Sequence, residues 1–410
     1  MRSKLDKHVL KNGMVLLGEP MPGVGSVAFN FLLPCGAATL GPGQCGAAAV
    51  IQDWVFRGAG ERNSRQLVDA LDGLGLHRST AVSTHHLAMG AAMEASNLAA
   101  ALELYADVIL RPRLEVEQFE LSRQLAIHDV IGLDDEPRQK VMIRLYEQFY
   151  PDPFGRPGIG KLEDLEKLTP LETADIVKTG FNPAETIFAL AGKYDFDAVC
   201  RQMEQLFDVP AGARRAEITP GKPGQLYTHV PHAGAQVHIG LMTAAPAITS
   251  ESYYDINVAV SVLSGGMSSR LFTEVREKRG LCYAVGARYS TLKDMAGISC
   301  YAGTTPEKAQ ETIDVIRGEF GRLWEGITPD ELERAKVGLE SSLIMQSESS
   351  SARASGIASD YFLLGRVRSL EEIKERLEAT SVDSVTRCLR ENRFDEYTTV
   401  TIGPREVVLT

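Results

Sequence analysis

Two spacings of hydrophobic residues share the first half of the chain. Residues 78–93 alternate between apolar and polar, residues 27–33 form an apolar run, and residues 8–18 carry an Asn12-Gly13 turn signal between apolar runs, so strands are predicted there. Helical spacing predicts helices over residues 46–58, 64–74, 97–110, 115–131 and 137–150. Strands and helices are mixed without a regular strand–helix–strand alternation.

The second half repeats this order of elements. Residues 237–242 correspond to the strand at 27–33, 254–263 to the helix at 46–58, and 284–301 to the alternating stretch at 78–93, followed by helical patterns over 306–323 and 328–345. The repeat is too long for a solenoid, so we interpret it as a duplicated domain. We predict an α+β fold of two similar domains, residues 1–209 and 225–410. Each has an antiparallel sheet packed with helices, and a Gly-, Pro- and Arg-rich linker joins them at 210–224.

Charge and composition exclude several classes of function. The 410 residues carry a net charge of −11, which argues against nucleic acid as a partner, because phosphate binding requires a basic surface. No apolar run reaches the roughly 18 residues that a membrane span needs. Residues 1–7 contain basic side chains with no apolar stretch behind them, so we expect no secretory signal and a cytoplasmic location, with the periplasm left open. The six cysteines are scattered without a C-x-x-C pair, which predicts neither disulfides nor a thiolate zinc site.

Several motifs give the chain a resemblance to the insulinase, pitrilysin and mitochondrial processing peptidase family of zinc proteases. They are the opening L-K-N-G-M-V-L-L, Phe56-Arg57-Gly58, Asp135-Glu136-Pro137, the segment P-F-G-R-P at 153–157 with Gly160, and G-G-M-S-S-R-L-F followed by R-E-K-R-G-L-C-Y at 265–283. The resemblance covers nearly the whole chain. It implies two similar α+β domains that face each other across a substrate chamber.

The catalytic motif of that family, H-x-x-E-H, is degenerate here. Two histidines one helical turn apart bind zinc, and the glutamate between them activates the bound water. The resemblance aligns Ala49 and Asp53 with the histidines, Gln52 with the glutamate and Asp129 with a third ligand on a later helix. Alanine cannot bind a metal, and an amide cannot act as a general base. We therefore expect no metal at this site and no peptidase activity from the chain alone.

Other histidines do not form an obvious replacement site. His85 and His86 are adjacent on a predicted strand and therefore point to opposite faces of it. His128 and Asp129 are adjacent on a predicted helix, where neighbours diverge by about 100°. We favour the interpretation that these are ordinary polar residues near a degenerate site, and leave open whether any metal binds them.

A second family motif is intact in this sequence. In the family, an arginine and a tyrosine seven residues apart in the second domain bind the substrate backbone and stabilise the tetrahedral intermediate, and Arg276 and Tyr283 match that pattern. A guanidinium group and a phenol can both donate hydrogen bonds to a developing oxyanion. The alternative is that Arg276 pairs with Glu274 or Glu277 and that Tyr283 is an ordinary strand residue, since the spacing alone is a weak pattern.

The resemblance extends to bacterial pairs in which one subunit carries H-x-x-E-H and the other carries the Arg/Tyr pair. This chain has the second profile, which implies a non-catalytic subunit of a heterodimeric zinc metallopeptidase that binds peptide. The partner would be a homologous H-x-x-E-H subunit, which would also hold the zinc, and the acidic charge of the chain would favour basic peptides. The alternative is a non-proteolytic structural or peptide-binding homologue that acts as a homodimer. A peptidase that acts alone through an unusual metal site is the least favoured interpretation.

Overall fold

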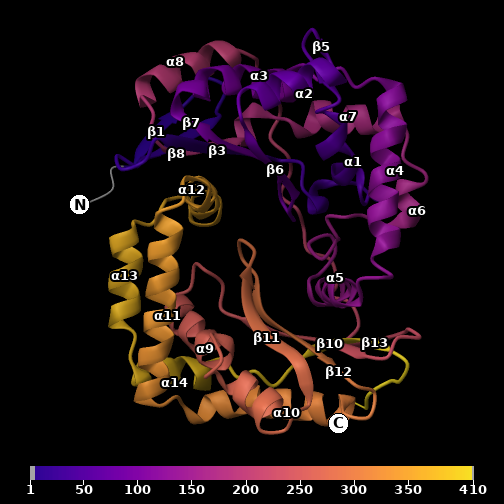
Figure 1. Cartoon of the computed structure of the whole chain (residues 1–410), viewed down its shortest axis with the longest axis vertical. Helices are drawn as coiled ribbons and strands as arrows, with labels where there is room; N and C mark the ends of the chain where they lie inside the picture. Colours follow the sequence, from indigo (N-terminus) through magenta and orange to yellow (C-terminus); the bar gives the residue numbers. More distant parts are fainter. Residues whose placement is uncertain (1–4, 409–410) are drawn as a thin grey trace. The chain divides into compact units, whose positions relative to one another are not determined.

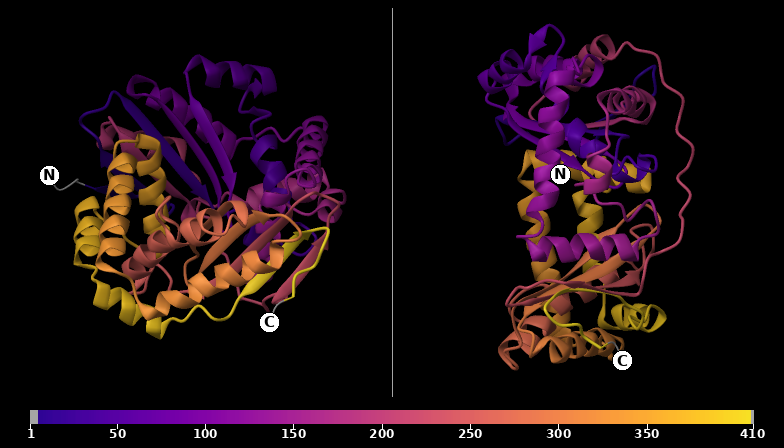
Figure 2. Two further views of the ribbon diagram at one scale, coloured as in Figure 1. Left: turned by 60° about the horizontal axis from the view of Figure 1, so that its bottom comes forward. Right: turned by 90° about the vertical axis from the view of Figure 1, so that its right-hand side faces the viewer.

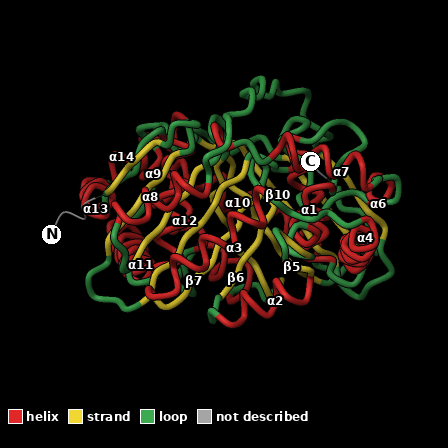
Figure 3. The backbone as a smooth tube through the Cα atoms, turned by 90° about the horizontal axis from the view of Figure 1, so that it is seen from above, coloured by secondary structure: helices red, strands yellow, loops and turns green. Residues whose placement is uncertain are grey.

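The computed structural model describes residues 5–408, so part of the stretch at 1–7 that bears on a secretory signal lies outside the described residues. Contacts between Cα atoms divide the chain into two compact units. Unit 1 comprises Met1–Gly132, Asp152–Gly221 and Gln346–Val367, and unit 2 comprises Leu133–Pro151, Lys222–Met345 and Arg368–Thr410. Helices and strands are interspersed along the chain (Figure 3).

Unit 1 contains a six-stranded sheet in the order β1-β2-β8-β3-β7-β6. Neighbouring strands run antiparallel except β2 and β8, which are parallel. The strands are β1 (Asp6–Val9), β2 (Val15–Pro20), β3 (Ser26–Leu33), β6 (His77–Val82), β7 (Leu87–Glu94) and β8 (Ile187–Gly192), with a small separate hairpin of β4 (Gly58–Ala59) and β5 (Arg62–Asn63). The helices are α1 (Ala47–Trp54), α2 (Ser64–Gly73), α3 (Leu98–Leu110), α4 (Val116–Gly132), α6 (Leu162–Leu165), α7 (Pro170–Gly180), α8 (Phe196–Leu206) and α12 (Ser350–Leu364).

Unit 2 contains a five-stranded sheet in the order β11-β12-β10-β13-β9, again with one parallel pair, β13 and β9. The strands are β9 (Tyr227–Pro231), β10 (Val237–Ala245), β11 (Cys282–Thr291), β12 (Ala296–Thr304) and β13 (Thr398–Gly403). The helices are α5 (Pro137–Phe149), α9 (Tyr253–Ser264), the π-helix η4 (Phe272–Glu277), α10 (Ala309–Arg322), α11 (Pro329–Ser347), α13 (Leu370–Ala379) and α14 (Val382–Glu391).

The two sheets have the same topology once β1 is set aside. The order β6-β7-β3-β8-β2 in unit 1 corresponds to the order β11-β12-β10-β13-β9 in unit 2. In both, neighbours among the first four strands are antiparallel and the last two strands are parallel. The predicted α+β class with antiparallel-rich sheets in two similar halves is therefore confirmed.

Each sheet buries large side chains on one face. In unit 1, Phe29 and Phe31 of β3 pack with Phe188 of β8 and with Tyr105 of α3. In unit 2, Ile239 of β10 and Ile298 of β12 belong to a buried cluster with residues of α9, α10 and α14. Because side chains alternate across a strand, the intervening residues point to the opposite face and need a second cover.

A single helix from the other half of the sequence supplies that second cover in each unit. Helix α5 lies against β10 and β13, where Val141 and Leu145 approach the bare backbone of Gly240. Helix α12 lies against β8 and β3, where Ile357 and Ala358 pack with Leu17. The colours of Figure 1 show this exchange, with magenta α5 among orange strands and gold α12 beside indigo and violet ones. The units therefore differ from the domains expected at 1–209 and 225–410, because each half contributes one helix to the other unit's sheet.

The stretch between α8 and β9, which includes the predicted linker at 210–224, has no helix or strand and is the long rose trace at the right of Figure 2. It is held at intervals by hydrogen bonds. The side-chain oxygen of Asn182 accepts from the Gly212 amide at 3.0 Å, and the Gln148 carbonyl accepts from the Gly224 amide at 2.8 Å. Among residues 5–408, no helix combines the length and apolar character that a bilayer crossing needs.

Candidate functional site

Helix α1 is held in place by close backbone packing at its start and by an aromatic residue at its end. Gly46 precedes the helix at φ +113°, and a Cβ there would lie 2.7 Å from the side chain of Leu165. At the other end, the indole nitrogen of Trp54 donates to the Glu115 carbonyl at 3.0 Å, and its ring meets Phe119 of α4 edge-on. These contacts fix the turn of α1 that carries Ala49, Gln52 and Asp53.

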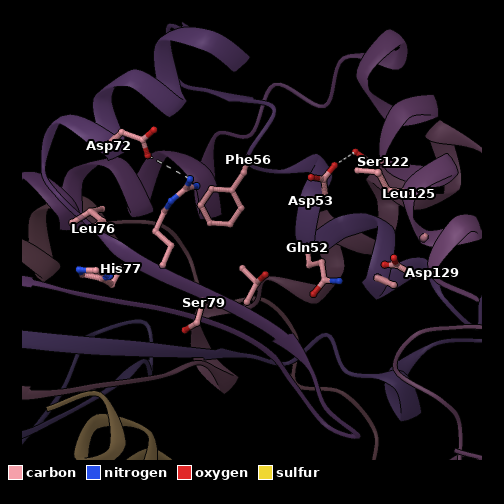
Figure 4. A pocket seen from close by; sticks show the side chains of 14 residues that line it. Gln52, Asp53, Phe56, Asp72, Leu76, His77, Ser79, Ser122, Leu125 and Asp129 are labelled. Carbon is pink, nitrogen blue, oxygen red and sulfur yellow. Dashed lines mark hydrogen bonds and ion pairs between the residues drawn. The ribbon is translucent and has the colours of Figure 1, made fainter. Parts of the chain in front are cut away.

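The four positions that the family resemblance assigned to a zinc site do come together. Ala49, Gln52 and Asp53 of α1 and Asp129 of α4 line one pocket of about 720 Å³ in unit 1. Figure 4 shows Gln52, Asp53 and Asp129 at one wall of this pocket, with His77 and Ser79 of β6 on the other side. The four residues that the resemblance placed at one site thus share one pocket in the structure.

The carboxylate of Asp53 serves as a link between helices. Its Oδ2 atom accepts from Arg57 Nε and from Ser122 Oγ of α4, both at 2.5 Å. Ala49 is buried and has no donor atom. Residues 5–408 contain no group of three or more His, Cys, Asp or Glu side chains arranged to hold a metal ion. This donor set therefore does not fit a catalytic zinc ion.

The remaining metal candidates are dispersed. His86 is buried with its ring edge-on to Phe362 of α12 at 4.3 Å, and burial, with a smaller effect of charge on His85, lowers the pKa of His86 to about 3. His85 faces the rings of Phe154 and Phe362. His128 is exposed on α4 and is not among the residues that line the pocket with Asp129. The structure thus gives His86 a packing role.

Arg276 and Tyr283 lie against each other in unit 2. The guanidinium carbon of Arg276 is 5.1 Å from the Tyr283 ring centroid and 4.8 Å from that of Phe272. Arg276 is on the π-helix η4, where the amide of Lys278 bonds to the Thr273 carbonyl at 2.9 Å, five residues back. π-Helical turns are rare and occur frequently at functional sites. No pattern in the sequence indicated this one.

Tyr283 is directed outward by an irregularity in its strand. The register between β11 and β12 shifts between Cys282 and Ala284, which leaves Tyr283 in a bulge, and the residue is 82% exposed. Bulges redirect side chains and are over-represented next to active sites. An exposed phenol beside a guanidinium presents two hydrogen-bond donors to an incoming group.

The expected alternative pairing of Arg276 is absent. Glu274 instead binds Lys278 at 2.6 Å and Arg279 at 2.7 Å, and hydrogen bonds from these two side chains lower its pKa to about 2. Within residues 5–408, no ion pair joins Arg276 to Glu277. Aromatic stacking, and not a carboxylate, positions the Arg276 side chain.

Arg276 and Tyr283 border a pocket of about 950 Å³ that lies wholly in unit 2. One wall is α5, through Arg138, Met142 and Tyr146, and the floor is the face of β11 and β12 that carries Ser299 and Tyr301. The α5 wall escaped the sequence analysis because its residues precede the expected domain boundary. Only the exchange of helices brings them to the Arg276 site.

Two family models match consecutive parts of the chain. The model described as insulinase (peptidase family M16) matches residues 25–160, and the model described as peptidase M16 inactive domain matches residues 167–339. The chain belongs to peptidase family M16. Within this family, an uncharacterized zinc protease of Rickettsia felis is 26% identical over 99% of both chains. An uncharacterized zinc protease of Mycobacterium tuberculosis is 27% identical over 97% of this chain and 93% of the relative.

Two solved structures share the fold over almost the whole chain. A peptidase M16 inactive domain from Pseudomonas fluorescens superimposes with a TM-score of 0.90 at 18% identity, covering 99% of each chain. A protease from Helicobacter pylori has a TM-score of 0.89 at 20% identity, covering 98% of this chain and 99% of that chain. The fold of these structures is thus present over almost the whole chain, and its unit 1 pocket is lined by Ala49, Gln52 and Asp53.

Proposed function

We propose that this chain is the non-catalytic subunit of a heterodimeric M16 metallopeptidase. It supplies Arg276 and Tyr283 to the active site of a homologous subunit that carries H-x-x-E-H and the zinc ion. The observation that carries the proposal is the contrast between the two pockets. The unit 1 pocket has the amide of Gln52 at the position that the resemblance assigns to the general base, and its Asp53 carboxylate is bound by Arg57 and Ser122, whereas Arg276 and Tyr283 stand together at the border of the unit 2 pocket.

The chemistry follows from the two donors. The exposed Tyr283 hydroxyl and the Arg276 guanidinium donate hydrogen bonds to the carbonyl oxygen of a bound peptide. These bonds strengthen as negative charge develops on that oxygen. The rings of Phe272 and Tyr283 restrain the guanidinium before substrate arrives, which reduces the ordering that binding would otherwise require. The zinc ion would act in the partner, where it supplies the activated water.

The first test is recovery of the partner. The full tagged chain is expressed in its native source, and co-purified proteins are identified by mass spectrometry. We expect a homologue that carries H-x-x-E-H, in roughly equal amount, and chelator-sensitive peptidase activity in the complex but not in the chain alone. Recovery of the chain only as a homodimer, with no such homologue, would contradict the proposal.

The second test addresses the two residues in that complex. Loss of one oxyanion donor costs about 10²–10³ in kcat in known cases, so Arg276→Ala and Tyr283→Phe should each reduce kcat strongly while the complex stays assembled. Arg393→Ala is the matched control, because Arg393 also stacks on an aromatic ring, Trp324 at 5.1 Å, outside the pocket. Normal kcat in the double variant would refute the role of the pair.

A non-proteolytic peptide-binding homodimer is the second candidate. It is favoured by β6, the terminal strand of its sheet, which is largely exposed along its length and lines the unit 1 pocket. Such an edge can accept an extended peptide by main-chain hydrogen bonds. A chain of complex III2 from Candida albicans has the same fold, with a TM-score of 0.87 at 18% identity over 99% of this chain and 98% of that chain. Peptide binding by an isolated homodimer, with no peptidase partner, would favour this candidate.

A further inference from the structure

Three arginines line the unit 2 pocket, and their charges are not matched by carboxylates. Arg138 comes from α5, Arg276 from η4 and Arg288 from β11, while Glu136 is the one acidic residue in the lining. Within residues 5–408, none of the three guanidinium groups takes part in an ion pair. The pocket is therefore cationic, although the chain as a whole carries a net charge of −11.

Acidic groups near the pocket are already used by other arginines. Glu331 binds Arg270 through two hydrogen bonds of 2.7 and 2.9 Å, and Glu274 binds Arg279 at 2.7 Å. Arg270 and Arg279 flank η4 in the sequence, yet neither lines the pocket. The two arginines that flank η4 are thus bound to carboxylates, whereas Arg276 on η4 is bound to none among the described residues.

Aromatic stacking and strand register space the three guanidinium groups along β11. Arg276 lies over Tyr283 at the start of the strand. Arg138 lies 4.9 Å from the ring centroid of Tyr301, whose partner across the strands is Gly286. Arg288 lies further along β11, directly opposite Ser299 of β12 in the strand register. The positions marked by residues 283, 286 and 288 span about 17 Å along a strand, which is the length of about five residues of extended peptide.

The floor beneath these arginines leaves room for a chain. Ala284 and Gly286 are small and share the face of β11 that points away from the buried cluster. The edge of β11 is less available, because the Ala287 amide donates to Ser264 Oγ at 2.8 Å. A ligand in this pocket would therefore lie over the face of the strand, where side chains make the contacts.

We propose that the unit 2 pocket selects acidic peptides, with Arg138 and Arg288 binding carboxylates further along β11 from the backbone contact made by Arg276 and Tyr283. The inference rests on the proposed function for that backbone contact and adds the class of substrate. Arginine suits this task, because its planar fork binds carboxylates in a bidentate manner. The pocket thus points to the opposite preference from the basic peptides that the net charge suggested. The net charge also disfavours long polyanions such as nucleic acid.

The test uses the purified full chain and fluorescence anisotropy with labelled extended peptides of equal length. One peptide has glutamate at alternate positions, a second has glutamine there and a third has lysine, each with a free or an amidated C-terminus. Exposed ion pairs contribute about 0.2–1 kcal/mol each, so we expect the glutamate peptide to bind several-fold to about tenfold more tightly than the glutamine peptide at low salt. Added salt should reduce this ratio.

Substitutions of single arginines test which residues produce the preference for the glutamate peptide. Arg138→Gln and Arg288→Gln should each lower the glutamate/glutamine ratio about threefold, Arg288→Glu should shift binding toward the lysine peptide, and Arg393→Gln should change nothing. Persistence of the ratio with amidated peptides identifies side-chain carboxylates as the ligand, and its loss identifies the terminal carboxylate. A ratio near one in the natural chain, or an unchanged ratio in the Arg138→Gln/Arg288→Gln double variant, would overturn the inference. Because this readout needs neither partner nor catalysis, its failure is distinct from failure to recover an H-x-x-E-H subunit.

Discussion

The pockets of unit 1 and unit 2 are built on sheets of the same topology, yet their charged groups are arranged in opposite ways. In unit 1, Asp53 is bound by Arg57 and Ser122, and Asp72 pairs with Arg78 at 3.7 Å. In unit 2, the arginines that line the pocket stack on aromatic rings or stand free of carboxylates. Carboxylates of the unit 1 pocket are thus held by neighbouring side chains, whereas guanidinium groups of the unit 2 pocket are not bound by carboxylates of the described residues. The comparison teaches that two sheets of the same topology can carry pockets with opposite arrangements of charge.

The largest effect should come from the buried ion pair in unit 1. Arg353 of α12 binds Glu19 of β2, and their side chains are only 10% and 6% exposed. Arg353→Leu leaves Glu19 charged and buried, which should lower the free energy of unfolding by about 3–5 kcal/mol in chemical denaturation. The double variant Glu19→Leu/Arg353→Leu should recover much of this loss. Arg138→Gln, at an unpaired pocket arginine, should change stability by less than about 0.5 kcal/mol. Similar losses for Arg353→Leu and Arg138→Gln would break the contrast between linked and available charges.

The exchanged helices should contribute comparably to the two units. Leu145 of α5 is fully buried against β10, and Ile357 of α12 is fully buried against β2 and β8. Leu145→Ala and Ile357→Ala should each cost about 2–5 kcal/mol of unfolding free energy. Leu121→Ala on α4, where the side chain is half exposed, is the control and should cost much less. A Leu145→Ala loss no larger than that of Leu121→Ala would mean that α5 does not stabilise unit 2.

A smaller effect is expected for the link at the degenerate site. Asp53→Ala removes the acceptor for Arg57 and Ser122, and the loss should be about 1–3 kcal/mol. Gln52 is one residue away, and its side chain makes no hydrogen bond to any other described residue. Gln52→Ala should therefore change stability by less than about 0.5 kcal/mol. Equal effects of the two substitutions in denaturation curves would argue against a structural role for Asp53.

The smallest effect concerns pH and His86. Burial, with a lesser contribution from His85, lowers the pKa of His86 to about 3, whereas an unfolded histidine titrates near 6.5. Below that value the unfolded chain binds a proton that the folded chain does not, so stability falls as the pH drops from 6.5 toward 3. His86→Phe should remove about 1.4 kcal/mol of the loss measured between pH 8 and pH 5.5. The exposed His128→Gln serves as control, and an unchanged pH slope in His86→Phe would contradict the burial of a neutral ring.

The sequence predicted the scaffold better than the site. Apolar periodicity located the strands around Val27 and Val237 and the helix that carries Ala49, because these residues face large buried clusters. Motif resemblance assigned Asp53 and Asp129 to one site, and in the structure both residues line the same pocket. Periodicity reports that one face of a helix is buried and says nothing about which sheet buries it, so the exchange of α5 and α12 was missed. For the same reason, the sequence did not place Arg138 of α5 beside Arg276. No sequence pattern predicted the π-helical turn that carries Arg276.

The exchange of α5 and α12 constrains how the protein is made. A ribosome that has synthesised the first 209 residues has produced α5 without the sheet it covers, and the sheet of unit 1 without α12. Neither half can complete its core until the chain has reached at least α12, beyond residue 350. Completing the N-terminal unit before the rest of the chain is made, which is the usual course for multidomain proteins, is therefore closed to this chain. Because each half contributes a helix to the other unit, loss of either half by gene recombination would leave the remaining sheet without that helix.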